Sequence, residues 1–322
     1  MVRAGLFLFL SFVAALPAAA AQVEYPRQPI KLVVPFAPGG TAEILARIIA
    51  DRMSCDLGQA VFVETIDGAG STVGTETVAR AKPDGYTLLM NTAPSFAINP
   101  LIYRNLKYDI VRDFVPISWM TRTPNVLVVR KNLPANSITE LVTYAKKNPG
   151  KLNYGSSGNG TVLHLSGVMF AQQAGIEMVH VPYRGGAPAM NDLVGGVIDL
   201  VFDNLPAALP QIKAGNVRAL AVTTKTRSKE LPLVRTLAEQ GFPDFATDTS
   251  SVIFAPKGTP PAVIARLSRA AMAAARDAET ATRLNAVGAE VIGSMPEVLA
   301  RFRDQQMSYW APIVRRAGVR IE

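Results

Sequence analysis

The feature of this sequence that most constrains the fold is a strand, a glycine-rich loop and an amphipathic helix in direct succession between residues 30 and 50. Residues 30–34 (IKLVV) are apolar and rich in β-branched side chains, which indicates a strand covered on both faces. Two prolines and two glycines then exclude regular structure over residues 35–41. From Ile44 to Met53, apolar residues recur at helical spacing. Such a unit aims the free N–H groups of a helix N-terminus out of one edge of a sheet, where anions bind readily.

A second glycine-rich loop, residues 155–161 (GSSGNGT), precedes another helical pattern. Its four side chains of a helix-capping type are Ser156, Ser157, Asn159 and Thr161. A helix needs only one N-cap, so the surplus indicates a ligand, with capping and turn formation as the alternative. His164 falls in the first turn of this helix, where ligand contact and a supporting role are equally open.

Two further strand ends carry candidate polar groups. The strand expected at residues 86–90 is followed by a small, hydroxyl-rich stretch, residues 91–96, which we expect to be a loop that brings Ser95 to the same sheet edge. The strand expected at residues 197–202 is followed by Asp203. This carboxylate would accept a hydrogen bond from a ligand amine or hydroxyl, or it would cap the next helix.

The first 21 residues differ from the rest of the chain. Arg3 gives a positive start, residues 6–16 are apolar, and residues 19–21 are alanines. This pattern is typical of a secretory signal peptide, cleaved near Ala21. No later run reaches the roughly 20 apolar residues that a membrane-spanning helix needs. We therefore expect the mature protein to be free in the periplasm.

Composition argues against several classes of function. The net charge of +8 favours anionic ligands, but no cluster of Lys and Arg with interleaved aromatic residues indicates nucleic-acid binding. One cysteine, Cys55, and two scattered histidines predict no metal site. Neither the Rossmann nor the P-loop fingerprint is complete, so no cofactor is expected.

Strands that alternate with helices predict an α/β fold with parallel strands. A compact strand at residues 126–129, between prolines, suits a crossover into a second domain, and the strand at residues 251–254 leads back. We therefore expect lobe 1 to contain residues 22–124 and 256–322, and lobe 2 to contain residues 125–255.

Several motifs, in order along nearly the whole mature chain, resemble those of the Bug-type solute receptors of tripartite tricarboxylate transporters. They are YPRQPI leading into PFAPGG at residues 25–40, GQ at 58–59, GAG at 68–70, PDGYTLL at 83–89, the loop and helix start at 154–165, HVPY with the glycine at 185, and RALAV at 218–222. One such motif would be weak, but the ordered set is specific.

The resemblance implies a two-lobe periplasmic-binding-protein fold of type II, a clamshell with two crossover segments that closes on a small carboxylate. It implies a monomeric, non-catalytic receptor that delivers its ligand to membrane permease subunits. Carried over by position, the ligand-binding residues are Phe36, Ala37, Gly40, Thr41, Ala69, Gly70, Ser95, Ser156, Ser157, Asn159, Thr161, His164 and Asp203.

The sequence departs from the family pattern at a few positions. Glu43 stands where Asp is usual, Asp67 where Pro is usual and Ser71 where Gly is usual. A tryptophan common near residues 249–251 is absent. These changes leave the expected fold alone and bear on the choice of ligand.

Two other functions stay open from the sequence. A receptor that feeds a sensor instead of a transporter would have the same sequence features. An exported hydrolase would use a serine of the second loop, such as Ser157, with His164. Against the hydrolase, the loop lacks the G-x-S-x-G elbow of such enzymes.

Overall fold

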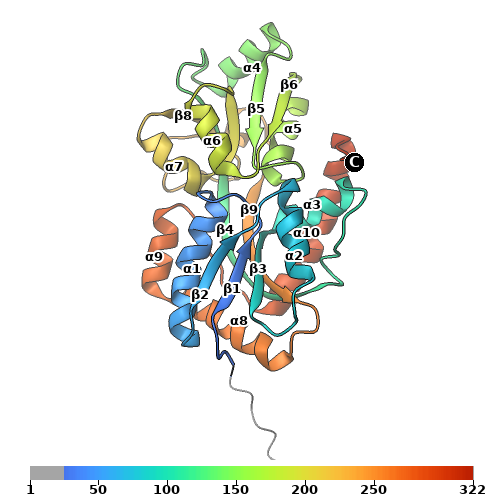
Figure 1. The fold of residues 1–322 in the computed structure, drawn as a ribbon. Coiled ribbons are helices and arrows are strands. Elements are labelled where there is room, and N and C mark those ends of the chain that lie inside the picture. Colours follow the sequence, from blue (N-terminus) through green and yellow to red (C-terminus); the bar gives the residue numbers. More distant parts are fainter. Residues whose placement is uncertain (1–24, 322) are drawn as a thin grey trace, which may run out of the picture.

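The computed structural model describes residues 25–321, which fold into two α/β lobes stacked along one long axis (Figure 1). The expected signal segment, residues 1–21, lies outside the described residues. The lower lobe of the figure contains strands β1 (Ile30–Val34), β2 (Val61–Thr65), β3 (Thr87–Thr92) and β10 (Glu290–Val291), and helices α1 (Thr41–Leu57), α2 (Thr72–Ala79), α3 (Ala93–Ile102), α8 (Pro261–Arg276), α9 (Ala278–Ala286) and α10 (Pro296–Ala317). The upper lobe contains strands β5 (Leu152–Ser156), β6 (Met178–Pro182), β7 (Leu200–Asn204) and β8 (Val217–Val222), and helices α4 (Ile138–Lys147), α5 (Val162–Ala174), α6 (Gly186–Val194) and α7 (Leu205–Lys213).

Two strands, β4 (Phe114–Arg130) and β9 (Asp248–Pro256), join the lobes (Figure 1). The strand order is β2-β1-β3-β9-β4-β7-β5-β6, with β8 and β10 also paired to β4. Parallel pairs link β1 to β2 and β3, and β5 to β6 and β7, as the alternation of strands and helices predicts. The strand β4 pairs with β9 up to Pro124 and with β7 from Asn125 onward, so the chain passes from one lobe to the other at this point.

Helices cover both faces of the lower sheet. Helices α1 and α8 pack together on one side, and α10 packs against α3 and β4 on the other (Figure 1). Trp119 of β4 stacks on Phe302 of α10, with ring centroids 3.8 Å apart and nearly parallel planes. Trp310, farther along α10, is also buried. Aromatic packing therefore fixes the C-terminal helix to the strand that joins the lobes.

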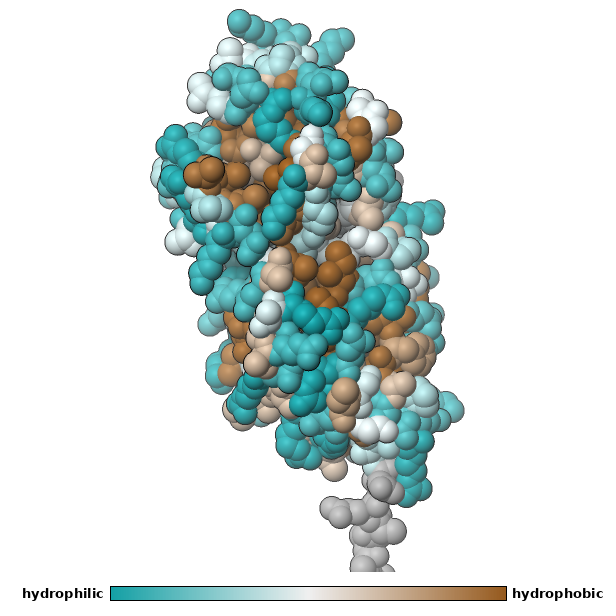
Figure 2. All heavy atoms as spheres, turned by 90° about the vertical axis from the view of Figure 1, so that its left-hand side faces the viewer, coloured by the Kyte–Doolittle hydropathy of each residue, from teal (hydrophilic) through white to brown (hydrophobic). Residues whose placement is uncertain are grey.

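The face formed by α1 and α9 below and α7 above is mostly hydrophilic (Figure 2). Its apolar residues appear as separate groups on both lobes. None of the helices within residues 25–321 has the length and apolar character needed to cross a bilayer.

The expectation of a loop at residues 91–96 is wrong. Strand β3 continues through Asn91 and Thr92, which pair with Val252 and Ser251 of β9, and α3 begins directly afterwards. The Thr92 hydroxyl donates to Ser95 Oγ over 2.7 Å. Ladder pairing with a strand from the far end of the sequence thus extends β3 beyond its apolar run.

The strand expected at residues 197–202 begins later, at Leu200. The reason is a turn after α6, in which the Val197 N–H donates to the Asp192 carbonyl over 2.8 Å. Val197 is 66% exposed, so this apolar residue does not belong to the buried strand.

The stack of Trp119 on Phe302 leads to a stability prediction. Replacing Phe302 with Ala should lower the free energy of unfolding by about 3 kcal/mol, because a buried aromatic side chain is lost and a cavity remains. Urea denaturation followed by tryptophan fluorescence measures the change, since Trp119 is one of only two tryptophans. The neighbouring exposed Arg301, changed to Ala, serves as the control and should cost less than about 0.5 kcal/mol. Equal stability of the two variants would contradict the prediction.

Candidate functional site

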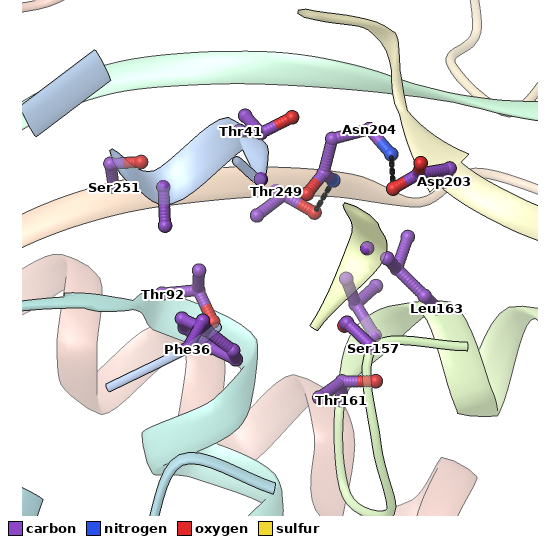
Figure 3. A pocket seen from close by; sticks show the side chains of 14 residues that line it. Phe36, Thr41, Thr92, Ser157, Thr161, Leu163, Asp203, Asn204, Thr249 and Ser251 are labelled. Atoms are coloured by element: carbon purple, nitrogen blue, oxygen red, sulfur yellow. Dashed lines mark hydrogen bonds between the residues drawn. The ribbon is translucent and has the colours of Figure 1, made fainter. Parts of the chain in front are cut away.

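A cavity between the lobes is lined by residues from both of them (Figure 3). The lining residues are Phe36, Gly40, Thr41, Ala42, Thr92, Ser157, Thr161, Val162, Leu163, Gly186, Asp203, Asn204, Thr249 and Ser251. The empty volume is about 470 Å³, including space open to solvent.

Five helices begin at this cavity. The lining set includes the N-cap or first-turn residues of α1, α3, α5, α6 and α7. It includes no Lys, Arg or His. Helix N-termini carry free backbone N–H groups and partial positive charge, so an anion here would be bound by the main chain and not by cationic side chains.

The loop before α1 is held in place by Glu43. The Gly39 N–H donates to Glu43 Oε2 over 2.6 Å, and Arg47 pairs with Oε1. The hydrogen bond from Gly39 and the Arg47 guanidinium lower the pKa of Glu43, so the carboxylate stays charged. The N-cap, Gly40, has no capping side chain, which leaves the first N–H groups of α1 available to a ligand.

In the loop before α5, Thr161 caps the helix, whereas from the sequence we expect it to contact the ligand. Thr161 is the N-cap: its Oγ1 accepts the His164 N–H over 3.3 Å and donates to the Gly158 carbonyl over 2.8 Å. Its hydroxyl proton is therefore committed within the protein. Ser157 lines the cavity from the same loop, beside Leu163 of the first turn (Figure 3).

The two histidines, which are 16 positions apart in the sequence, are stacked on each other. The ring centroids of His164 and His180 are 4.0 Å apart, with planes 13° from parallel. The parallel pairing of β5 and β6 sets Tyr154 opposite His180 and thus brings His180 behind the loop. Burial lowers the pKa of His164 to about 4, and burial together with His164 lowers the pKa of His180 to about 3. The pair supports the loop in its neutral form.

Ser156 and His180 form a hydrogen-bonded pair, with 2.7 Å between Oγ and Nε2. Such a pair could suggest a nucleophile and its base. However, Ser156 is fully buried and neither residue lines the cavity. A histidine with a pKa of about 3 is also a poor general base at neutral pH. The pair therefore positions the loop and does not form a catalytic dyad.

The lobes touch at two rims beside the cavity. At one rim, the Ala37 N–H donates to the Arg184 carbonyl over 2.9 Å. At the other, the Tyr103 hydroxyl donates to the Ala69 carbonyl (2.9 Å) and lies 3.4 Å from the Asn159 carbonyl. There Gly70 has a φ of +60°, and a Cβ on it would lie 1.8 Å from the Asn159 oxygen. Only glycine allows this approach of the two main chains.

A polar network lies at the crossover between the lobes. The Asn204 side-chain amide donates to Asn125 Oδ1 (2.6 Å) and to Thr249 Oγ1 (2.7 Å), and Thr249 donates to Asn125 Oδ1 (2.9 Å). Asn125 belongs to β4, Thr249 to β9 and Asn204 to the end of β7. Because Asn204 and Thr249 also line the cavity, the hinge and the site share side chains.

A further cross-lobe contact caps a helix. The Thr41 hydroxyl, at the start of α1, accepts the Ala207 N–H of α7 over 3.1 Å. Closing the lobes thus satisfies one of the free N–H groups that α7 would otherwise present.

Asp203 is the one ionisable side chain in the lining set. Its Oδ1 accepts the Asn204 N–H over 2.8 Å, and its Oδ2 has no hydrogen-bond partner within residues 25–321. Complete burial raises the pKa of Asp203 to about 7, against the smaller lowering effect of the Asn204 N–H. The described residues therefore leave one oxygen of this cavity-wall carboxyl group without a partner.

The structure places the sequence-predicted site residues in three positions. Those that line the cavity are Phe36, Gly40, Thr41, Ser157, Thr161 and Asp203. Those at the rims are Ala37, Ala69, Gly70 and Asn159. Those behind the lining are Ser95, Ser156 and His164. The lining residues that sequence reasoning missed are Ala42, Thr92, Val162, Leu163, Gly186, Asn204, Thr249 and Ser251.

Some departures from the family pattern line the cavity and others do not. Glu43, Asp67 and Ser71 do not line the cavity; Asp67 lies 3.9 Å from Arg184 across the rim. Thr249 and Ser251, by contrast, do line it, where a tryptophan is usual. The missing tryptophan was therefore the signal that could have identified this part of the site.

Gly70 gives a prediction on closure. The Gly70→Ala variant should prevent the closed arrangement, because its Cβ would collide with the Asn159 carbonyl of the other lobe. Small-angle scattering should show a larger radius of gyration than for the wild type under the same conditions. The matched control is Gly58→Ala, which has a similar φ of +69° and nothing within 4 Å of its Cβ. An unchanged radius in the Gly70 variant would refute the prediction.

The histidine pair gives a prediction on pH. The folded pKa values lie below the unfolded value of about 6.5, so the unfolded state binds more protons as the pH falls. The free energy of unfolding should therefore fall from pH 6.5 toward pH 4, by up to about 1.4 kcal/mol per pH unit for each histidine. Asp203, with its raised pKa, acts in the opposite direction below pH 7.

Urea denaturation at pH 7.5, 6.0 and 5.0 measures this dependence. The double variant with both histidines changed to Gln keeps Asp203, so the difference between its slope and that of the wild type isolates the histidines. Parallel pH profiles for the two proteins would mean that the histidines do not titrate as inferred.

The chain matches the family described as tripartite tricarboxylate transporter family receptor, TctC, over residues 45–319. The periplasmic binding protein BugD has 39% sequence identity and a TM-score of 0.90, covering 92% of this chain and 100% of its own. Rpa4515 of R. palustris, solved with adipate, has 37% identity and a TM-score of 0.89, covering 92% and 99%. MatC from Rhodopseudomonas palustris, solved with malate, has 32% identity and a TM-score of 0.86, covering 90% and 100%.

These similarities confirm the resemblance to Bug-type receptors and the expected two-lobe fold. The relatives are periplasmic binding proteins and not enzymes, which removes the hydrolase alternative. The chain belongs to the TctC family of periplasmic solute-binding receptors of tripartite tricarboxylate transporters.

Proposed function

We propose that the protein captures a small carboxylate in the cavity between its lobes and delivers it to the membrane permease subunits of a tripartite tricarboxylate transporter. The observation that carries this proposal is the meeting of five helix N-termini in a cavity without cationic side chains. Relatives solved with adipate and malate support a carboxylate as the ligand.

The strength of binding requires both lobes. One helix N-terminus contributes roughly 0.3–1 kcal/mol toward an anion, and up to about 2 kcal/mol when partly buried. A micromolar dissociation constant corresponds to about 8 kcal/mol. The helix N-termini of both lobes must therefore act together: those of α1 and α3 from one lobe, and those of α5, α6 and α7 from the other. Hydrogen bonds to the ligand in a cavity closed to bulk water supply the rest. Closure is part of binding, because a ligand favours the closed form only by contacting both lobes.

The residues in this function have two roles. Phe36, Gly40, Thr41, Ser157 and the start of α5 contact the ligand. The rim residues allow the lobes to close around it. We further infer that the segment before residue 22 directs export, and that the receptor acts as a monomer without a cofactor or nucleic acid.

Ligand-induced stabilisation tests the proposal. Protein stripped of bound ligand by unfolding and refolding is heated with acetate, succinate, malate, adipate and citrate in turn. At a concentration one hundred times the dissociation constant, a ligand adds about 2.7 kcal/mol of stability, which raises the melting temperature by several degrees. Mass spectrometry of the compound that co-purifies with the untreated protein extends the panel. Gly58→Ala should keep the shift and Gly70→Ala should lose it.

The absence of any shift across the panel, together with the absence of a co-purifying acid, would reject carboxylate binding. Delivery to the transporter needs a separate experiment. A strain lacking the gene should lose uptake of the ligand so identified, and normal uptake in that strain would instead favour a receptor that feeds a sensor.

A further inference from the structure

Asp203 is a completely buried carboxyl group at the cavity wall, and one of its oxygens is unused. Strand β7 ends one residue later, at Asn204, whose N–H donates to Oδ1 over 2.8 Å. No donor within residues 25–321 reaches Oδ2. A buried carboxylate oxygen without a hydrogen bond is costly, so an oxygen left in this state at a cavity wall indicates a donor that arrives with the ligand.

The neighbouring polar groups of the cavity are already engaged. The Thr41 hydroxyl accepts the Ala207 N–H, and the Thr92 hydroxyl donates to Ser95. The hydroxyl protons of Thr161 and Thr249 are donated to Gly158 and Asn125. Thr92, Thr161 and Thr249 therefore have their hydroxyl protons committed elsewhere, and no hydrogen bond joins the Thr41 hydroxyl to Asp203 Oδ2.

Glycine at position 186 makes room for the Asp203 carboxyl group. Helix α6 starts directly beside it: a Cβ on Gly186 would lie 2.6 Å from Oδ1 and 3.4 Å from Oδ2. Asp203 is only 1% exposed, and it belongs to the cavity wall next to Asn204 (Figure 3).

We propose that Asp203 determines specificity by accepting a hydrogen bond from the ligand, so that the receptor selects hydroxy- or amino-substituted carboxylates over unsubstituted carboxylates of the same length. This inference rests on the proposed function, because it assumes that a carboxylate of the ligand lies at the helix N-termini. The ligand then has two ends of different chemistry, an anionic group held by backbone N–H groups and an O–H or N–H donor held by Asp203. An unsubstituted dicarboxylate would instead leave Oδ2 unpaired.

Two sets of compounds with matched carbon chains test the inference. The first set is succinate, malate and aspartate, and the second is adipate, 2-hydroxyadipate and 2-aminoadipate. Affinity is measured by titration calorimetry at one salt concentration and at about pH 8.5, above the pKa of about 7 of Asp203, so that its carboxylate is charged. Within a set that binds, at least one substituted compound should bind about 10- to 100-fold more tightly than its unsubstituted parent, as a hydrogen bond to a charged group is worth this ratio. Which substituent gains more distinguishes a hydroxy acid from an amino acid.

The isosteric variant Asp203→Asn should reduce that ratio to less than about threefold. Asp51→Asn is the control, because it removes the same charge from an exposed position on α1 and should leave the ratio unchanged. Since the ratio is first measured in the wild type, the test does not depend on whether the Asp203 variant folds.

The outcomes separate the two proposals. Equal binding of all three members of a set supports the proposed function and overturns the role of Asp203. A large ratio that persists in Asp203→Asn also overturns it, as does tighter binding of the unsubstituted parent. Failure of all six compounds to bind, at concentrations up to 10 mM, counts against both proposals.

Discussion

The constraint on which the proposed function depends is that the cavity presents helix N-termini, and no cationic side chain, to a ligand. A lysine or arginine can adjust its long side chain to a ligand, but an N–H group moves only with its helix. The two lobes must therefore be placed accurately relative to each other. The polar network of Asn125, Asn204 and Thr249 at the crossover, and the cap that Thr41 gives to α7, serve this requirement. The overall charge of +8 adds a general attraction for anions without entering the site.

Much of the fold follows from local patterns in the sequence. Residues 30–34 form a strand and residues from 41 form a helix because apolar spacing and the prolines and glycines between them leave few other choices. Helix α4 begins where local signals favour a helix start, with Ser137 as N-cap and Glu140 in the first turn. The two loops that meet at the cavity, represented by Gly40 and Ser157, were identified from the same signals.

The rest of the site could not be predicted, because it depends on contacts between distant segments. His180 lies behind the second loop only because β6 pairs with β5. The sequence of a five-residue strand does not indicate which strand it pairs with. Ser95 is buried because β9 extends the ladder of β3 by two residues. Ser251 and Gly186 reach the cavity through the crossover and through the fit between the lobes. Composition and periodicity carry no information on these placements.

The rim contacts make closure of the lobes largely independent of the choice of ligand. The bonds from Ala37 to Arg184 and the approach of Gly70 to Asn159 involve main-chain atoms, whose chemistry is the same for any side chain. Substitutions at Ser251 or at other wall positions outside the hinge network can thus change the bound ligand while the closed form keeps the same outer surface. A membrane partner that recognises the outer surface of the closed form would accept a receptor with a new ligand without any change in its own surface. We therefore expect a change of ligand to require substitutions in the cavity wall and to leave the rims as they are.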